Sequence, residues 1–175
     1  MTCAGLQQPT LIVFGGLPGT GKTTVSQALA IRLKAAYLRL DTIEQAMRAA
    51  GIDPVGPAGY GIANALAEAN LRLGLTVIAD CVNPVAESRT AWRQTAARVL
   101  ARLVEVELVC SDAAEHRRRV EGRSADLPGH RLPTWEAVTR HEFEPWDGDH
   151  LVLDTATTAL AEAVNRVEAH ALNRP

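Results

Sequence analysis

The feature that most constrains the fold is a glycine-rich turn between an apolar run and a helical pattern. Residues 11–14 read Leu-Ile-Val-Phe, which predicts a short buried strand that two glycines stop. Residues 16–23, Gly-Leu-Pro-Gly-Thr-Gly-Lys-Thr, fit the pattern G-x-x-x-x-G-K-[ST] without a mismatch. From Lys22 to about Lys34, apolar side chains recur at helical spacing. A strand, a glycine loop and a helix in this order predict the first unit of a parallel α/β sheet.

The residue types of this loop indicate a phosphate site. Its glycines reach backbone angles that other residues avoid, so backbone N–H groups can point inward around phosphate oxygens. The helix that starts near Lys22 adds the positive end of its dipole. In loops of this pattern the lysine reaches the β- and γ-phosphates and the next threonine binds Mg²⁺, which predicts these roles for Lys22 and Thr23. The nucleotide-binding residues are therefore expected to be Gly16, Leu17, Pro18, Gly19, Thr20, Gly21, Lys22, Thr23 and Thr24.

Strands and helices are expected to alternate along the rest of the chain. Further buried strands are predicted at residues 36–40, 76–79, 104–110 and 151–153. Helices are predicted at 41–50, 60–73 and 84–100, from 112 onward, at 134–142, and finally up to about 172. This alternation predicts a single α/β domain over residues 1–175, with a five-stranded parallel sheet flanked by helices on both faces. A polar stretch at about 122–133 is predicted to form a short lid.

Composition limits the kinds of partner. Of the 175 residues, 47% are hydrophobic and 22% are charged, which is ordinary for a soluble globular domain. The formal net charge of −2 provides no basic field for duplex nucleic acid or an anionic membrane surface. No apolar run approaches the ~20 residues that cross a bilayer. Cys3, Cys81 and Cys110 are an odd number without metal-ligand spacing, and no secretory leader pattern is present, which predicts reduced thiols in a cytoplasmic protein.

Two acids close predicted strands and are candidates for chemistry. Ligands of open α/β sheets bind outside the carboxyl ends of the strands, so Asp41 and Asp80 are expected to face the glycine loop. Asp41 could accept the proton of a hydroxyl acceptor, and the alternative is a simple helix cap. Asp80 could hold Mg²⁺ through water or orient the acceptor. Which of the two acids is the base stays open at this point.

A basic run before the polar stretch supplies the remaining candidates. Arg119 and Arg123 are four residues apart on one predicted helix face and are expected to contact the triphosphate as the lid closes. The alternative is a pair of surface charges. Arg117 and Arg118 are expected to point outward. Arg89 either reaches an anionic acceptor or lies on a solvated helix face.

Three smaller signals complete the pattern. Asn83, followed by a proline, is expected to cap the helix that starts at residue 84. In a chain with only 4% aromatic residues, Trp135 and Trp146 either border an acceptor pocket or pack in the core or the lid, and packing is favoured.

With these positions placed, the chain resembles the small P-loop kinases often labelled AAA family ATPase or zeta-toxin-like, a group that includes polynucleotide kinase, adenylylsulfate kinase, gluconate kinase and chloramphenicol phosphotransferase. The resemblance rests on Gly16–Thr24, Asp41, Val77–Arg89, Arg119–Arg123 and Val152–Thr155. It implies a kinase that uses Mg²⁺ and ATP to phosphorylate a hydroxyl of a small molecule. The base-reading motif of a GTPase, Asn/Thr-Lys-x-Asp, does not occur in the sequence. The alternative is a nucleotide-hydrolysing switch or regulatory ATPase that acts on a protein partner.

One departure from the resemblance bears on the acceptor. In polynucleotide and adenylylsulfate kinases the motif after the second strand looks like D-x-x-R, with the arginine on the acceptor. Here the residues are Asp41-Thr42-Ile43-Glu44, so that arginine is missing. The stretch is closer to that of chloramphenicol phosphotransferase, as is the pair Asp154-Thr155 before the last helix. The resemblance therefore favours a neutral hydroxyl compound as acceptor.

Overall fold

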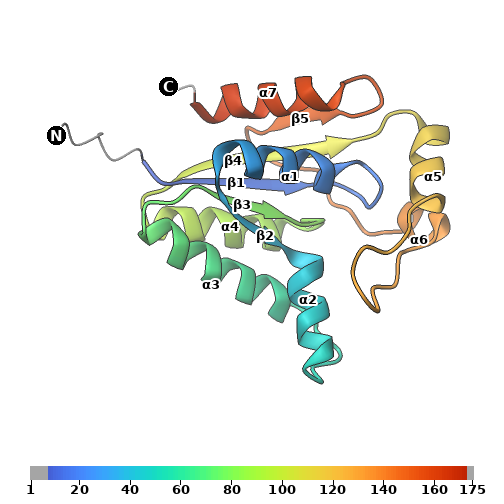
Figure 1. Cartoon of the computed structure of the whole chain (residues 1–175), viewed down its shortest axis with the longest axis horizontal. Coiled ribbons are helices and arrows are strands. Elements are labelled where there is room, and N and C mark those ends of the chain that lie inside the picture. The colour runs from blue at the N-terminus through green and yellow to red at the C-terminus, as the bar shows by residue number, and fades with distance from the viewer. Residues whose placement is uncertain (1–7, 173–175) are drawn as a thin grey trace.

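The computed structural model describes residues 8–172, which form a parallel sheet of five strands (Figure 1). In spatial order the strands are β2 (Ala36–Arg39), β3 (Val77–Asp80), β1 (Thr10–Gly15), β4 (Arg102–Val109) and β5 (Leu151–Asp154). The predicted five-stranded parallel α/β fold is confirmed, and each strand lies within two residues of its expected bounds.

Helices cover both faces of the sheet. They are α1 (Lys22–Leu33), α2 (Leu40–Ala49), α3 (Ala58–Arg72), α4 (Ala86–Arg98), α5 (Ala113–Glu121), α6 (Trp135–Thr139) and α7 (Leu160–Leu172). Side chains of β1 alternate between two cores: Ile12 and Phe14 pack toward α1 and α7, whereas Leu11 and Val13 pack toward α3 and α4. Because both faces are covered, the strand is a continuous apolar run without the polar alternation of an exposed sheet.

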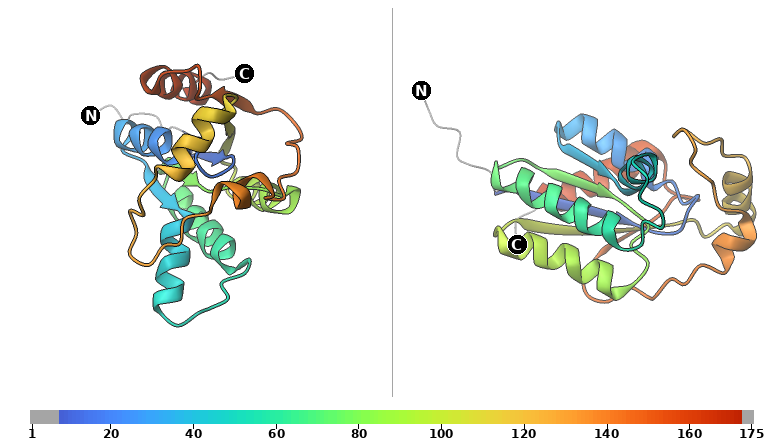
Figure 2. Two further views of the ribbon diagram at one scale, coloured as in Figure 1. Left: turned by 90° about the vertical axis from the view of Figure 1, so that its right-hand side faces the viewer. Right: turned by 90° about the horizontal axis from the view of Figure 1, so that it is seen from below.

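The carboxyl ends of the strands form a separate region. Helices α2, α5 and α6 lie beyond this edge of the sheet, on the side toward which the strand arrows point (Figures 1 and 2). Between α5 and α6, residues 122–134 contain no helix or strand. This is the edge at which an open α/β sheet binds its ligands.

Two helix starts differ from expectation. Helix α4 begins at Ala86, and Asn83 is not its cap: it has a φ of 55° and its backbone N–H donates to the Tyr60 hydroxyl at 2.9 Å. A contact from α3 therefore overrides the local Asn-Pro signal. Helix α2 begins at Leu40, which places Asp41 inside the first turn and rules out its role as a helix cap.

Two of the three cysteines lie in the described part of the chain. Cys81 and Cys110 are free thiols, while Cys3 lies outside the described residues. Within residues 8–172, no helix combines the length and the apolar character that a membrane crossing requires.

Candidate active site

The glycine loop connects β1 to α1 and turns its backbone amides to one side. Gly16, Gly19 and Gly21 have φ values of 133°, 86° and 88°, which are left-handed angles that a side chain would disfavour. Within residues 8–172, the amides of Gly21, Lys22 and Thr23 donate to no backbone or side-chain acceptor. Free amides at a helix start form a concave donor surface suited to an anion.

Lys22 is the buried cation of this loop, with 8% of its surface exposed. Its Nζ donates to the carbonyl of Leu17 at 2.8 Å, and it forms no ion pair with any acid of the described part of the chain. Burial lowers the pKa of Lys22, and the negative charges of Asp80 and Asp41 oppose that shift. The two predicted acids therefore lie close enough to Lys22 to act on its charge.

A cavity of about 410 Å³ opens against the loop and brings most of the predicted residues together. It is lined by Gly19, Gly21, Lys22, Thr23, Thr24, Gln27, Arg119, Arg123, Ser124 and Asp126. A second cavity, of about 460 Å³, shares Gly21, Thr24 and Arg119 with the first and continues along residues 155–160. The two cavities form one path from the loop to the end of β5.

Asp80 lies at the carboxyl end of β3 and is almost fully buried. The Tyr37 hydroxyl donates to its Oδ2 at 2.7 Å and lies 3.4 Å from Ser26 Oγ on α1. Burial and the charge of Asp80 raise the pKa of Tyr37 well above its usual value, so the hydroxyl stays a donor. Oδ1 of Asp80 accepts no hydrogen bond from residues 8–172. Sequence reasoning missed Tyr37, for which the only signal is an aromatic ring between two aliphatic residues of a short strand.

Asp41 is held by an arginine that sequence reasoning also missed. Arg39, the last residue of β2, donates from Nη2 to Asp41 Oδ2 at 3.3 Å and to Asp126 Oδ1 at 3.1 Å, and Nη1 also donates to Asp126. A hydrogen bond from Arg39 lowers the pKa of Asp126 to about 2. The sequence signal for Arg39 was a charged residue at the end of a strand. Its pairing with Asp126 could not be predicted, because the two residues are 87 positions apart in the chain.

The two predicted arginines have different surroundings. Arg119 donates to Glu115 at 2.7 Å, to the Thr155 hydroxyl at 2.8 Å and to the Thr155 carbonyl at 3.1 Å. Arg123 has one ion pair, a loose one of 3.6 Å to Asp126. Arg119 is therefore fixed beside both cavities, whereas Arg123 is weakly held at the first one. Arg117 and Arg118 are exposed, as predicted, and pair with glutamates of their own helix.

Helix α5 packs directly on the tip of the loop. His116 is buried, and its Nε2 lies 2.8 Å from the carbonyl of Pro18. A Cβ added to Gly19 would come within 2.5 Å of Val120 Cγ2, so the loop touches this helix closely. Trp135 packs edge-on against the His116 ring at 5.2 Å between centroids. Nothing in the local sequence distinguishes His116 from an ordinary helix residue.

Arg89 and Trp146 lie outside both cavities. Arg89 is 1% exposed, lies 5.5 Å below the Trp146 ring, and donates to the carbonyls of Asn83 and Pro145 at 3.3 and 3.1 Å. It is neither solvated nor directed at the loop. Trp146 covers Gly15, where an added Cβ would lie 2.2 Å from its ring. These residues fasten the segment before β5 to the core.

The site fits a nucleoside triphosphate with Mg²⁺. The loop amides, Lys22 and the two arginines supply donors and positive charge, and the oxygens of Thr23 and Asp80 are ligands of the kind that Mg²⁺ prefers. Among residues 8–172, no three His, Cys, Asp or Glu side chains converge as a metal cage. A Mg²⁺ bound mainly by phosphate oxygens needs only one or two protein ligands.

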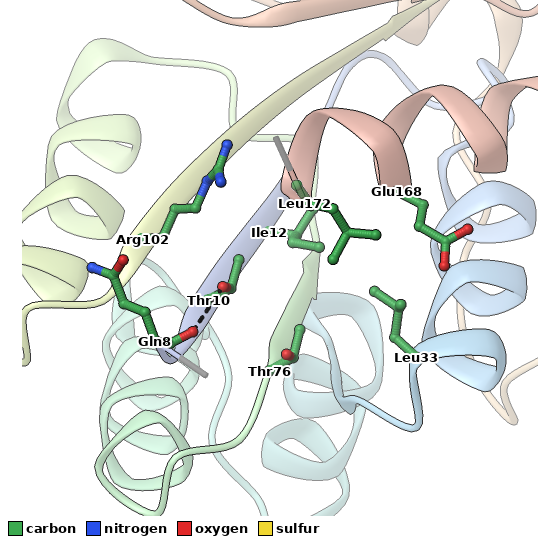
Figure 3. Close-up of a pocket in the computed structure, with 9 residues that line it drawn as sticks. Gln8, Thr10, Ile12, Leu33, Thr76, Arg102, Glu168 and Leu172 are labelled. Carbon is green, nitrogen blue, oxygen red and sulfur yellow. Dashed lines mark hydrogen bonds between the residues drawn. The ribbon is translucent and has the colours of Figure 1, made fainter. Parts of the chain in front are cut away.

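A further cavity lies at the opposite edge of the sheet. Its volume is about 230 Å³, and Thr10, Leu33, Arg102 and Glu168 are among its lining residues (Figure 3). It opens at the amino ends of the strands, so it has no access to the loop.

A parallel sheet with a glycine loop after its central strand, a buried lysine and convergent arginines defines the class of P-loop nucleotide-binding proteins. Residues 11–141 match a family model described as an AAA domain, so the chain belongs to this family of P-loop proteins. A search of the curated proteins found no match.

Several solved structures have folds similar to that of this chain. A protein from Chloroflexus aurantiacus that is assigned as a kinase is 25% identical, with a TM-score of 0.76, over 94% of this chain and 99% of that one. The APS kinase of Mycobacterium tuberculosis, solved with AMPPNP and APS, is 20% identical, with a TM-score of 0.71, over 93% of this chain and 96% of that one. A gluconokinase from Sinorhizobium meliloti is 22% identical, with a TM-score of 0.64, over 93% and 91%. The expected resemblance to small P-loop kinases is confirmed at the level of the fold.

Proposed function

We propose that this protein is an ATP-dependent phosphotransferase that moves the γ-phosphate of Mg²⁺–ATP to a hydroxyl of a small molecule. The observation that carries the proposal is that two carboxylates, Asp41 and Asp80, lie at the strand ends beside the phosphate loop: Asp80 is in register with Phe14 of β1, and Arg39 lies beside Asp80 and bonds Asp41. A loop that only held a nucleotide would need no acid on the acceptor side. The similarity to small kinases supports the same function.

The nucleotide would occupy the two connected cavities. Phosphates would lie against the loop amides and Lys22, and the rest of the nucleotide would extend past Arg119 toward residues 155–160. Three hydrogen bonds hold the Arg119 guanidinium in place, so it would position the nucleotide rather than move during turnover. Arg123 has only a loose partner and can turn toward the transferred phosphate as residues 122–133 close.

Asp80 and Asp41 would have different roles in the reaction. Thr23 and Asp80 are the residues that would hold Mg²⁺, which when bound would supply positive charge against the phosphates. Tyr37 restrains one oxygen of Asp80 and leaves the other free to face the metal or its waters. Asp41 has a more exposed carboxylate, with 37% of the side chain accessible, and would accept the proton of the acceptor hydroxyl.

The test is a screen of hydroxyl compounds with γ-labelled ATP, with the label followed onto the acceptor. Lys22→Ala should lower transfer by about 10²- to 10³-fold. Lys34→Ala is the matched control, because Lys34 is the other lysine of the chain and is exposed. Asp41→Asn should lower transfer by about 10²- to 10⁴-fold and leave Mg²⁺–nucleotide binding nearly intact. Asp80→Asn should change the Mg²⁺ dependence as well as the rate.

Two outcomes would contradict the proposal. If Asp41→Asn kept full activity, the base would be Asp80 or water. If a protein partner stimulated ATP hydrolysis and no labelled small molecule formed, the protein would be a nucleotide-hydrolysing switch instead.

A further inference from the structure

A buried arginine lies at the acceptor side of the site. Only 5% of the Arg39 side chain is exposed, and its Nε is buried without an acceptor among the described residues. In the sheet register Arg39 is directly beside Asp80, and its guanidinium donates to both Asp41 and Asp126. A guanidinium in this setting is costly to bury unless anions satisfy it, and its fork of donors matches a planar carboxylate or a phosphate.

The main partner of Arg39 is Asp126, which does not lie in a helix or a strand. Asp126 belongs to the irregular segment between α5 and α6, and 48% of its side chain is exposed. Asp41, in contrast, is part of a helix and lies two residues from Arg39 in the chain. Of the two carboxylates on Arg39, Asp126 is therefore the one that can leave without unfolding an element.

Asp126 also lies on the boundary between two cavities. It lines the phosphate cavity, while the next residues of its segment, 128–131, line a cavity of about 800 Å³ against α2. The side chains of Glu44, Gln45 and Arg48 on α2 form the facing wall. An acceptor that reached from the α2 cavity to the phosphate cavity would follow this segment, which carries Asp126 and its bond to Arg39.

We propose that Arg39 is the anion-binding residue of the acceptor site, and that the acceptor is a hydroxyl compound with a carboxylate or phosphate group that replaces the carboxylate of Asp126. The inference rests on the proposed function. It reverses the neutral acceptor that the missing arginine of the D-x-x-R motif favours, because Arg39, two residues before Asp41, brings a guanidinium next to that carboxylate. Asp126 then acts as the protein's own substitute for the anion of the acceptor.

The remaining charges agree with this assignment. In the proposed reaction Asp41, which also bonds Arg39, receives the proton and Asp80 holds the metal, so Asp126 is the carboxylate that an acceptor can replace. A neutral acceptor would leave Asp126 paired with Arg39. An acceptor anion would take over the donors of Arg39 and also reach its unused Nε.

The test uses matched pairs of probes in the presence of saturating Mg²⁺ and AMPPNP, which occupy the phosphate loop. Glycerate and glycerol 3-phosphate are compared with glycerol, and gluconate with sorbitol, by calorimetry and by the NMR signal of the Arg39 Nε–H. We expect at least one anion to bind and to shift that signal, and its neutral counterpart to do neither. Asp126→Asn should strengthen anion binding by about 10- to 100-fold, the value of one charged hydrogen-bonded pair.

Substitutions of Arg39 test whether its guanidinium binds the anion. Arg39→Lys should retain the fold and lose most of the anion affinity, because an ammonium lacks the planar fork. Arg39→Gln should lose more affinity, and circular dichroism establishes whether it folds. Asp149→Asn is the control for charge, because it removes one carboxylate from an exposed position away from the segment 122–134.

Three results would overturn the inference. They are equal binding of neutral and anionic probes, unchanged or weaker anion binding by Asp126→Asn, and no anion binding at all by that variant. Failure of the proposed function looks different, because these measurements need no turnover. Anions bound at Arg39 without any phosphate transfer would refute the kinase and leave the anion site, whereas transfer to a neutral compound would refute the anion site alone.

Discussion

The Thr155 hydroxyl joins three parts of the site, which makes Thr155→Val an informative substitution. It donates toward the carbonyls of Thr20 and Val109, at 2.9 and 3.2 Å, and accepts from Arg119 at 2.8 Å. One hydroxyl proton serves one acceptor at a time, so the substitution removes one neutral bond and one bond to a charged group. Valine has nearly the same shape, so the effect comes from the lost bonds rather than from a cavity.

The expected size follows from those two bonds. A neutral hydrogen bond contributes about 0.5–1.5 kcal/mol and one to a charged group about 1.5–3 kcal/mol. Arg119 keeps its bonds to Glu115 and to the Thr155 carbonyl, so its charge is not left unpaired and the lower ends of these ranges apply. We expect the free energy of unfolding to fall by about 2 kcal/mol. For a chain of this size, the melting temperature should fall by about 4–8 °C.

The assay combines urea unfolding with nucleotide binding. Because Arg119 borders both cavities, looser positioning should also weaken nucleotide affinity a few-fold, while kcat with a saturating nucleotide changes less. Thr139→Val is the matched control: its exposed hydroxyl donates to the carbonyl of Glu136 on its own helix at 3.0 Å, so stability should change by less than about 0.5 kcal/mol. If Thr155→Val matched this control in both measurements, the hydroxyl would not be a link between β5, the loop and Arg119.

Three further predictions concern neighbouring groups. Arg123→Ala should lower kcat more than nucleotide affinity, and Arg119→Ala should do the opposite; steady-state kinetics separate the two, and identical profiles would contradict the assignment. His116→Ala should lower the free energy of unfolding by about 1–3 kcal/mol, because the Pro18 carbonyl loses its partner, whereas His116→Gln should restore part of the loss in the same urea titration. The pKa of Asp126 is lowered to about 2, so its pair with Arg39 stabilises the protein above the unfolded pKa of about 4 and is lost as pH falls from there toward 2. Because Asp126 is half-exposed, the change should be small, and Asp126→Asn should remove this part of the acid transition in urea unfolding followed against pH.

The fold was predictable from local pattern because the central strands β1 and β3 are covered on both faces. The runs at residues 11–14 and 77–79 are apolar without interruption, whereas the segments between them repeat apolar residues at helical spacing, so strand and helix could be distinguished along the chain. The prediction was wrong at Asn83, where the Tyr60 hydroxyl binds the backbone N–H and holds the residue in a left-handed conformation. That contact spans 23 residues, and no pattern within a single helix reports it.

Some residues of the site could likewise be predicted from the sequence, and others could not. The phosphate loop is a contiguous motif whose backbone geometry follows from its glycines, so its residues could be read in sequence. The side chains that bond the acids of the site could not be predicted from the sequence. Tyr37, which bonds Asp80, lies 43 residues from it, and Arg39 lies 87 residues from its partner Asp126. Arg89 shows the same limit: its helix position was compatible with solvent or with a ligand, and carbonyls more than 50 residues away determine its actual surroundings.

The environments of the two acids argue for a division of labour between them. Asp80 is nearly buried, and one of its oxygens is committed to a tyrosine hydroxyl that stays protonated, so only its other oxygen is free for a cation. A carboxylate with a fixed donor and little access to solvent is suited to a metal and its waters, which need a stationary charge. Asp41 is more exposed and shares Arg39 with a replaceable partner. If an acceptor anion displaces Asp126, Arg39 holds that anion and Asp41 together, and the hydroxyl that is to lose its proton is drawn to the carboxylate that receives it. The same arginine would then select the acceptor and orient the base.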